Sequence, residues 1–355
     1  MNTVRVLLAG HDSGGLNVLA PLLQEWNDDA RFIPHFLAGP RIRRDFRYRV
    51  PGIQFAAGAD ELTERLFHRP AELDGYLQGV LSKGNYDAVV CGTSANALLE
   101  KRLLHAAKSA GVPSVAICDM WWAYTERFHD GQNWTLPDRL WVLDDAMRTA
   151  AEQVAWPSEL AIDIVGSPLF AQLMRRRTTN GGDGARAIRY ISEPVSTSFP
   201  EAGIDEFALA DMLVSAAAAA KLAAPIVIRP HPVESAEAWR RWTFVRRAQG
   251  VSLDTLPVEE AVADTRLAVG ISSIMLAELR MCGVPVASLQ PPMADRSYFC
   301  LPFEDLGISR VSSEQALAQW LASPADSPLL ATSAVHAAAI ETATRLLLDF
   351  VSGRG

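Results

Sequence analysis

The sequence predicts an α/β protein built from two successive, mainly parallel sheets. Short unbroken apolar stretches alternate with amphipathic helical stretches along most of the chain, and strands covered on both faces have this unbroken pattern. A Gly-, Asn- and Thr-rich stretch at residues 178–185 interrupts the series and is typical of a flexible joint. At 355 residues the chain is long enough for two domains of common size.

The first half contains the longer series of predicted strands. A helix is expected from Gly15 to Trp26, and another from Ala95 to Ala110. The strands are expected at residues 4–9, 31–37, 87–92, 113–119, 139–144 and 161–166.

The second half repeats the pattern. Helices are expected up to residue 224, through Trp239 and Trp242, and from Ser273 to Cys282. Strands are expected at residues 187–194, 225–230, 251–256, 265–270 and 284–289. The tail, Ser333–Val351, is expected to form one long amphipathic helix. We therefore predict domains at 1–168 and 169–332, with residues 333–355 packing back on the first.

Composition excludes several classes of protein. The net charge of −8 argues against a nucleic-acid-binding protein. The start of the chain lacks the basic region of a signal peptide, and no apolar stretch approaches the twenty residues of a membrane span. Cys91, Cys118, Cys282 and Cys300 lack C-x-x-C spacing. Reduced core thiols and a cytoplasmic location are expected.

One histidine lies between two prolines at the end of a predicted strand, in the letters RPHP. Each proline fixes its own φ and keeps the preceding residue out of the helical region. The strand therefore ends in a stiff loop at the edge where parallel sheets bind ligands. There His231, with Arg229 beside it, suits a phosphate oxygen. The alternative is a rigid structural loop whose histidine caps a neighbouring carbonyl.

A second motif, the letters GISS, leads from a predicted strand into a predicted helix. Ser272 or Ser273 is well placed as the N-cap, and a helix N-terminus offers free N–H groups to an anion. Glu278 is expected to reach ribose hydroxyls, and Ser192 to add a hydroxyl at the same edge. A plain capped helix is the alternative. Together with His231, the motif predicts a phosphate site.

The glycine-bearing turn Gly10–Gly15 follows the first predicted strand. It is not G-x-G-x-x-G, and it lacks the lysine of a P-loop, so dinucleotide-binding and NTPase functions are disfavoured. Gly14 and Gly15 permit close approach of an acceptor to the backbone, and Asp12 could serve as a base. A purely structural turn is the alternative.

Aromatic residues surround the end of another predicted strand. Asp119 is followed closely by Trp121 and Trp122, with further aromatic residues up to residue 134. Aromatic faces beside a carboxylate suit a sugar ring, and the carboxylate could act as general base toward an acceptor hydroxyl. Arg127 is counted among the acceptor-binding residues. The alternative is aromatic packing at a domain interface.

Five arginines lie within the segment Arg41–Arg49 of an otherwise acidic chain. They could contact an anionic acceptor or an inner membrane surface, or they could form only a solvated helix face. The chain has no H-E-x-x-H motif and no clustered Cys and His for zinc. Ser272 lacks the G-x-S-x-G frame of a hydrolase. No metal and no cofactor are therefore expected.

These motifs resemble those of a known family. Two β/α domains with RPHP and GISSIMLAELRMCGVPV in the second are similar to the GT-B glycosyltransferases, and most of all to bacterial sialyltransferases and capsule transferases. DIVGSPLF followed by IRYISEPV is similar to the crossing between the domains of such proteins. The resemblance implies two Rossmann-like domains facing across a cleft. It also implies that His231, Pro232, Ser272 and Ser273 hold the nucleotide of the donor.

The resemblance further implies a metal-independent glycosyltransferase of polysaccharide biosynthesis. Its co-substrate would be a CMP- or UDP-sugar, and its acceptor a saccharide or another hydroxyl compound. The family's acidic base lies in an Asp/Glu-Asp/Glu-Gly motif, of which only Asp119 matches here. Asp119, or failing that Asp12, would take the acceptor proton.

Related enzymes with similar C-terminal motifs remain as alternatives. They are the CDP-glycerol phosphotransferases and the hydrolysing UDP-N-acetylglucosamine 2-epimerases. The epimerases carry Ser-Gly-Gly before a Glu-Glu pair, whereas this chain has Ser-Ser and the single Glu278. A non-catalytic GT-B binding subunit is the alternative from another class. The oligomeric state is not predicted.

Overall fold

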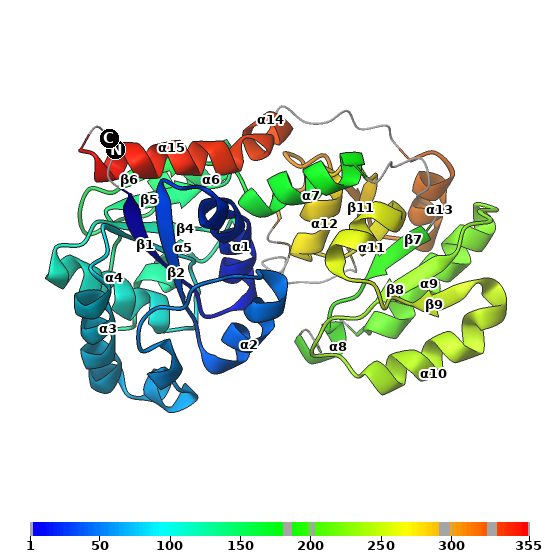
Figure 1. Ribbon diagram of the computed structural model, residues 1–355. Helices are drawn as coiled ribbons and strands as arrows, with labels where there is room; N and C mark the ends of the chain where they lie inside the picture. Colours follow the sequence, from blue (N-terminus) through cyan, green and yellow to red (C-terminus); the bar gives the residue numbers. More distant parts are fainter. Residues whose placement is uncertain are drawn as a thin grey trace. The chain divides into compact units, whose positions relative to one another are not determined.

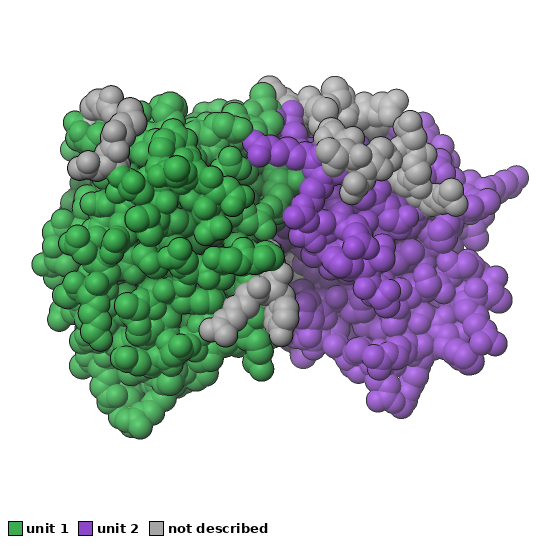
Figure 2. Space-filling view, viewed as in Figure 1, with its two compact units in different colours: residues 1–172, 334–355 green, residues 173–333 purple. Residues whose placement is uncertain are grey.

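The computed structural model describes residues 3–179, 187–198, 200, 203–290, 299, 301–324 and 332–353. The chain divides into two compact units (Figure 2). Unit 1 comprises Met1–Gln172 and Ala334–Gly355, and unit 2 comprises Leu173–Ser333. Each unit has its own six-stranded sheet with helices around it (Figure 1). The predicted α/β class with two parallel sheets is confirmed.

The sheet of unit 1 has the strand order β2-β1-β3-β4-β5-β6, and all neighbouring strands are parallel. The strands are β1 (Val4–Ala9), β2 (Phe32–Leu37), β3 (Ala88–Cys91), β4 (Ser114–Ile117), β5 (Arg139–Val142) and β6 (Ala161–Ile164). Because consecutive strands are parallel, their carboxyl ends share one edge, where unit 1 carries its polar loops.

Helices of the first half and of the tail surround this sheet, and the last helix of the first half continues past Gln172 into unit 2. They are α1 (Ser13–Asp28), α2 (Pro40–Arg49), η1 (Ala59–Glu61), η2 (Glu64–His68), α3 (Pro70–Gly84), α4 (Leu99–Ala110), α5 (Tyr124–Phe128), α6 (Asp145–Glu152), α7 (Pro168–Thr179), α14 (Thr332–Ala337) and α15 (Ala339–Val351). The prediction that α4 begins at Ala95 is wrong. Ser94 Oγ instead accepts the Ala97 N–H at 3.1 Å, and this turn delays the helix to Leu99.

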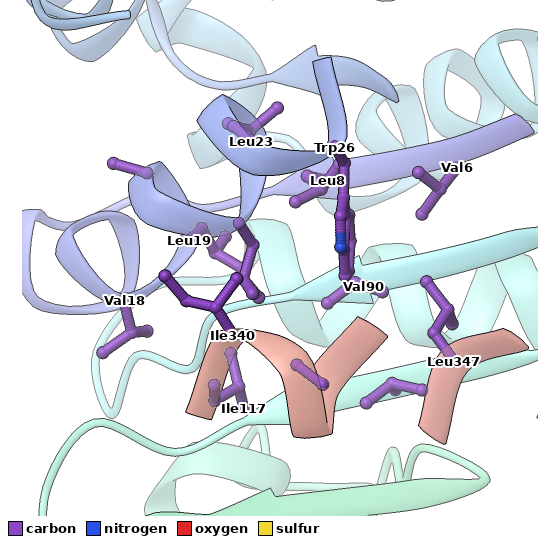
Figure 3. Packing of buried hydrophobic residues seen from close by; sticks show 14 of the residues in the cluster. Val6, Leu8, Val18, Leu19, Leu23, Trp26, Val90, Ile117, Ile340 and Leu347 are labelled. Carbon is purple, nitrogen blue, oxygen red and sulfur yellow. The ribbon is translucent and has the colours of Figure 1, made fainter. Parts of the chain in front are cut away.

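The tail forms two helices rather than the single helix predicted. The backbone leaves helical geometry at Ala338, where ψ is 3°, between α14 and α15. In Figure 3 the α15 side chains of Ile340 and Leu347 point toward α1 and the sheet. Trp26 of α1 donates its indole N–H to Thr344 Oγ1 at 2.8 Å. The tail therefore completes the core of unit 1.

The sheet of unit 2 has the strand order β12-β11-β10-β7-β8-β9, again all parallel. The strands are β7 (Ala187–Ile191), β8 (Ile226–Arg229), β9 (Val251–Leu253), β10 (Thr265–Gly270), β11 (Val286–Leu289) and β12 (Ser309–Val311). The sequence prediction missed β12, because its three residues carry no apolar run. Strand β7 lies between β8 and β10, which places the loops after these three strands side by side.

The helices of unit 2 pack around a core that includes Tyr190, Trp239 and Trp242. They are α8 (Val195–Ser198), α9 (Glu206–Ala219), α10 (Ala236–Arg246), η5 (Arg247–Gln249), α11 (Val258–Asp264), α12 (Ile274–Met281) and α13 (Glu314–Ala322). Trp239 and Trp242 contact each other edge to face at 5.4 Å. Their ring contact fixes the buried side of α10.

Two sequence predictions fall partly outside the described residues. Thr178 and Thr179 of the expected joint belong to α7, and residues 180–186 are not described. Cys91, Cys118 and Cys282 are buried and form no disulfide with one another, whereas Cys300 is not described. No helix in the described part of the chain is both long and apolar enough to cross a membrane.

Candidate functional site

The loops after β7, β8 and β10 bring several predicted residues to one edge of the unit 2 sheet. Ser192 follows β7, His231 follows β8, and Ser272 and Ser273 follow β10. Because β7 lies between the other two strands, its loop is adjacent to both. This is the edge where open parallel sheets bind ligands.

The N-terminus of α12 already holds an anion supplied by the chain itself. The Glu193 carboxylate accepts the backbone N–H groups of Ile271 at 3.2 Å, Ser272 at 2.7 Å and Ser273 at 3.0 Å. We call these three amides the amide cradle. N–H groups at a helix N-terminus, together with the helix dipole, favour a negative charge. The anion-binding character expected from the sequence is therefore present, but Glu193 fills the cradle.

Sequence reasoning missed Glu193, although it names the preceding residue Ser192. Two features were available as a signal. An acidic residue closely follows a buried strand, and the loop after the neighbouring strand begins a helix. Gly270 helps to bring the loops together, because a Cβ there would lie 2.8 Å from the Ile191 carbonyl oxygen. Only glycine permits this approach of β10 to β7.

The start of α12 is capped as the sequence predicts. Ser273 is the N-cap, and its Oγ accepts the Met275 N–H at 3.4 Å. Ser272 and Glu278 are both buried. The predicted contact between Glu278 and ribose hydroxyls stays a prediction.

A glutamate that the sequence analysis missed organises the loop of His231. Glu234 accepts the Ser192 hydroxyl at 2.7 Å and the backbone N–H of His231. His231 is exposed, and its Nδ1 accepts the Val233 N–H at 3.4 Å; desolvation lowers the pKa of His231. A neutral imidazole that accepts at Nδ1 carries its proton on Nε2, so His231 is a neutral donor. Pro232 beside it is exposed.

Arg229 lies with a different group of residues. Its Nη1 contacts Asp254 Oδ2 at 2.8 Å and the Leu256 carbonyl oxygen at 3.0 Å. The fully buried Arg189 contacts the same Asp254 Oδ2 at 3.0 Å. Arg229 is thus bound to the loop after β9. Its role in holding a phosphate stays a prediction without a contact to support it.

Unit 1 places a buried ion pair at the carboxyl end of its sheet. Asp119 follows β4, and its Oδ1 accepts a hydrogen bond from Arg127 Nη1 at 2.7 Å. Burial raises the pKa of Asp119; the Arg127 charge opposes this rise and the Asp12 carboxylate adds to it. Arg127 also donates to Thr93 Oγ1 at 2.6 Å. The guanidinium that was expected to bind an acceptor is directed at Asp119 and Thr93.

The glycine turn after β1 lies against Asp119. A Cβ added to Gly14 would lie 2.1 Å from Asp119 Oδ2, so any side chain at this position would displace the Asp119 carboxylate. Gly15 also approaches Gly92 closely, because a Cβ on Gly92 would lie 2.8 Å from Gly15 Cα. Asp12 Oδ1 accepts the Gly15 N–H at 2.9 Å as the N-cap of α1. Asp12 therefore has a structural role beside the catalytic one that the sequence suggested.

A second buried acid in this region, Glu100, was not predicted. Its Oε1 accepts the His11 N–H at 2.7 Å, and its buried Oε2 has no hydrogen-bond partner among the residues that the structure describes. Desolvation, followed by the Asp12 charge, raises the pKa of Glu100 to about 8. At neutral pH Glu100 is therefore mainly protonated, and it holds the turn that contains Gly14.

The aromatic stretch after Asp119 separates into buried and exposed residues. Trp121 is buried, and its indole N–H donates to Asp144 Oδ2 at 2.8 Å. Trp122 is 48% exposed and keeps a face that a sugar could use. Phe128 and Trp134 each contact Trp156 edge to face. Much of the aromatic signal therefore reflects packing within unit 1.

Helix α2 contains the arginine-rich segment. Arg41 and Arg44 are exposed, whereas Arg43 contacts the Ala59 carbonyl oxygen and Asp60. The side chains of residues 45 and 47–49 lie outside the description. Nothing described tests a membrane or acceptor role for this segment. Among the residues that the structure describes, no three His, Cys, Asp or Glu side chains could hold a metal ion.

A cavity of about 750 Å³ lies at the opposite end of the unit 1 sheet. It is lined by Val4 at the start of β1, by Arg31 and Asp87 before β2 and β3, and by residues of α15. Because open parallel sheets bind ligands at the carboxyl ends of their strands, this cavity is not the candidate site.

Comparison with known proteins identifies the fold. No protein-family model and no curated protein sequence matches the chain. Among solved structures, the chain is similar to the UDP-GlcNAc 2-epimerase from Neisseria meningitidis bound to UDP-GlcNAc, with a TM-score of 0.69 and 12% identity over 98% of this chain and 100% of that one. The chain has the GT-B fold.

Two further solved structures are also similar. MurG from Acinetobacter baumannii matches with a TM-score of 0.54 and 14% identity over 99% of both chains. HepE from Anabaena, in complex with UDP and glucose, matches with a TM-score of 0.55 and 13% identity over 99% of this chain and 100% of that one. At such identities the likeness concerns the fold alone, so function depends on the residues described above.

Proposed function

We propose that the protein is a nucleotide-sugar enzyme that transfers the sugar of a UDP- or CMP-activated donor to a hydroxyl acceptor. The observation that carries the proposal is the amide cradle, which follows β10 at the same sheet edge as the His231 loop after β8, with β7 between the two strands. Three converging backbone N–H groups hold a carboxylate at the ligand edge of a parallel sheet. A donor phosphate offers the same kind of negatively charged oxygen acceptor to the same donors.

In this proposal the phosphate takes the place of the Glu193 carboxylate. Both anions cannot occupy the amide cradle together, so Glu193 must leave when the donor binds. His231 would add a hydrogen bond from Nε2–H, because its Nδ1 already accepts from Val233. The Glu234 contacts keep this imidazole at the sheet edge. The neutral donors and the helix end stabilise the charge that grows on the leaving nucleotide.

Asp119 is the proposed base of the transfer. The acceptor hydroxyl oxygen bonds to the anomeric carbon as the bond from that carbon to the phosphate oxygen breaks. The hydroxyl proton passes to Asp119, and the nucleotide leaves with the electron pair. A raised pKa makes Asp119 a stronger proton acceptor than an exposed aspartate, and Arg127 fixes its orientation. Trp122 offers an exposed ring for the acceptor sugar.

A second candidate is a 2-epimerase acting on a UDP-sugar. It is favoured by the higher TM-score of the epimerase, 0.69 against 0.54 and 0.55 for MurG and HepE. Against it, this chain has Ser-Ser and Glu278 where those enzymes carry Ser-Gly-Gly and a glutamate pair. The Neisseria epimerase structure contains UDP-GlcNAc and the Anabaena HepE structure contains UDP, so UDP is the first nucleotide to test. The resemblance to sialyltransferases makes CMP the second.

Calorimetric titration with UDP, CMP, CDP and GDP tests the binding step. We expect one nucleotide to bind, and His231→Ala to weaken it at least tenfold because a phosphate donor is lost. His105→Ala, an exposed histidine of α4 in unit 1, is the control and should leave the Kd unchanged. Binding of no nucleotide, or equal Kd values for both variants and the parent chain, would contradict the proposal.

Product analysis with the matching sugar nucleotides separates the candidate reactions. Sugar transfer to a saccharide acceptor, with release of the nucleotide, is the expected result. Release of a free 2-epimerised sugar and UDP without an acceptor would instead assign the epimerase reaction. Tight nucleotide binding without turnover of any donor, together with an unaffected Asp119→Ala variant, would indicate a binding subunit.

A further inference from the structure

Helix α10 of unit 2 has two sides of opposite character. Trp239, Trp242 and Thr243 are buried against the unit. On the other side lie exposed residues spaced by one helical turn, followed by one residue of η5. We call this set the α10 outer face: Arg240, Arg241, Phe244, Val245 and Arg247.

Two bulky apolar side chains of the α10 outer face stand in solvent. Phe244 is 63% exposed and Val245 is 75% exposed. The Arg247 guanidinium lies over the Phe244 ring, 4.4 Å from its centroid. Helix α10 runs along the lower right of Figure 1, next to β9. Neighbouring exposed apolar side chains rimmed by cations are typical of an interaction surface rather than of a plain solvated helix.

The charge of the α10 outer face differs from that of the whole chain. It carries three exposed arginines in a protein of net charge −8. One of them, Arg241, is paired with Glu237 one turn earlier. The local excess of positive charge therefore complements an anionic partner, which the acidic remainder of the protein would repel.

We propose that the α10 outer face attaches the protein to an anionic lipid bilayer. Phe244 and Val245 would enter the interface, while the arginines meet the headgroups. Two apolar side chains are too little surface for a stable protein partner. A symmetric contact with a second copy would bring like-charged arginines together. The α10 outer face lies outside the nucleotide site, so this inference does not depend on the proposed function.

Vesicle flotation with the full chain tests the inference. At low ionic strength we expect binding to vesicles of phosphatidylcholine with 30% phosphatidylglycerol, and none to phosphatidylcholine alone. Arg240→Ala with Arg247→Ala should weaken binding at least tenfold, because each arginine contributes about fivefold. Phe244→Ser with Val245→Ser should weaken it by a similar factor, and salt should weaken it further.

Arg65→Ala with Arg69→Ala is the matched control, since both arginines are exposed in unit 1 and lie outside the arginine-rich segment of α2. This variant should bind vesicles as the parent chain does. Loss of binding in the control alone, or no binding to anionic vesicles at all, would overturn the inference. The inference would also be overturned if the parent chain forms a dimer and the Phe244→Ser, Val245→Ser variant is a monomer. Unchanged melting temperatures show that the variants fold.

Discussion

The two strand-end sites of this protein are built from opposite materials. In unit 2 the polar groups that converge are backbone N–H donors, and the residue that fills them is the acid Glu193. In unit 1 the converging side chains are the acids Asp12, Glu100 and Asp119, with Arg127 as their buried cation. Backbone N–H groups at a helix N-terminus attract an anion. Carboxylates that lie close together hold their protons more tightly, because their negative charges repel one another.

In the proposed function, this difference separates the work of the two units. Unit 2 would hold the anionic phosphate, and unit 1 would take the proton of a neutral hydroxyl. If this division is correct, changes in unit 1 should affect turnover without affecting nucleotide binding. Changes in the amide cradle should affect nucleotide binding first.

The largest expected effect is that of Asp119→Asn. The amide cannot accept the acceptor proton, so turnover should fall at least a hundredfold, while the nucleotide Kd changes less than twofold. Steady-state kinetics and calorimetry on the same samples provide the measurement. The control is Asp163→Asn, which removes a partly exposed ion pair with Arg139 in unit 1 and should leave both values intact. Retention of more than a tenth of the turnover by Asp119→Asn would exclude it as the base.

Gly14→Ala should have the next largest effect. The new Cβ would meet Asp119 Oδ2 at 2.1 Å and force this carboxylate to move, so we expect kcat to fall at least tenfold with the nucleotide Kd unchanged. Gly75→Ala is the matched control, because a Cβ there meets no atom within 4 Å in helix α3. Full turnover in Gly14→Ala would show that the position of Asp119 does not matter.

Glu100 gives unit 1 a dependence on pH. Its pKa is raised from 4.5 to about 8 in the folded chain, so the folded state binds the proton more tightly than the unfolded state. The resulting stability is fully present below pH 4.5 and is lost as the pH rises through about 8. Glu100→Gln should remove this loss, which amounts to at most about 1.4 kcal/mol per pH unit. Urea unfolding at pH 5 and pH 8 measures the difference, and an identical pH dependence in both proteins would refute a protonated Glu100.

Much of the fold could be predicted from the sequence, because buried parallel strands have short continuous apolar runs. This signal fails for β12, whose residues Ser309–Val311 have no such run. It also fails at Ala338, where no proline or glycine marks the break between α14 and α15.

The candidate site was predicted only in part. His231, Ser272 and Ser273 follow neighbouring strands, and strand ends can be located from sequence. The roles of Glu193 and Glu234 could not be assigned, because their partners are distant in sequence. Glu193 binds the amides of residues 271–273, which lie 78 to 80 residues away along the chain. Glu234 binds Ser192, which lies 42 residues away. Which acid accepts hydrogen bonds from which N–H groups depends on the order of the strands in the sheet. The pattern of apolar residues does not predict that order.

The proposed function requires that the donor phosphate replaces the Glu193 carboxylate in the amide cradle. Calorimetry of Glu193→Gln with the bound nucleotide tests this directly, because the neutral amide competes less well than a carboxylate for the three N–H groups. We expect the Kd to fall at least fivefold, whereas Glu206→Gln, a buried glutamate of unit 2 that binds Ser196 instead, should leave it unchanged. If a folded Glu193→Gln protein has an unchanged or higher Kd, the phosphate does not replace Glu193 in the amide cradle.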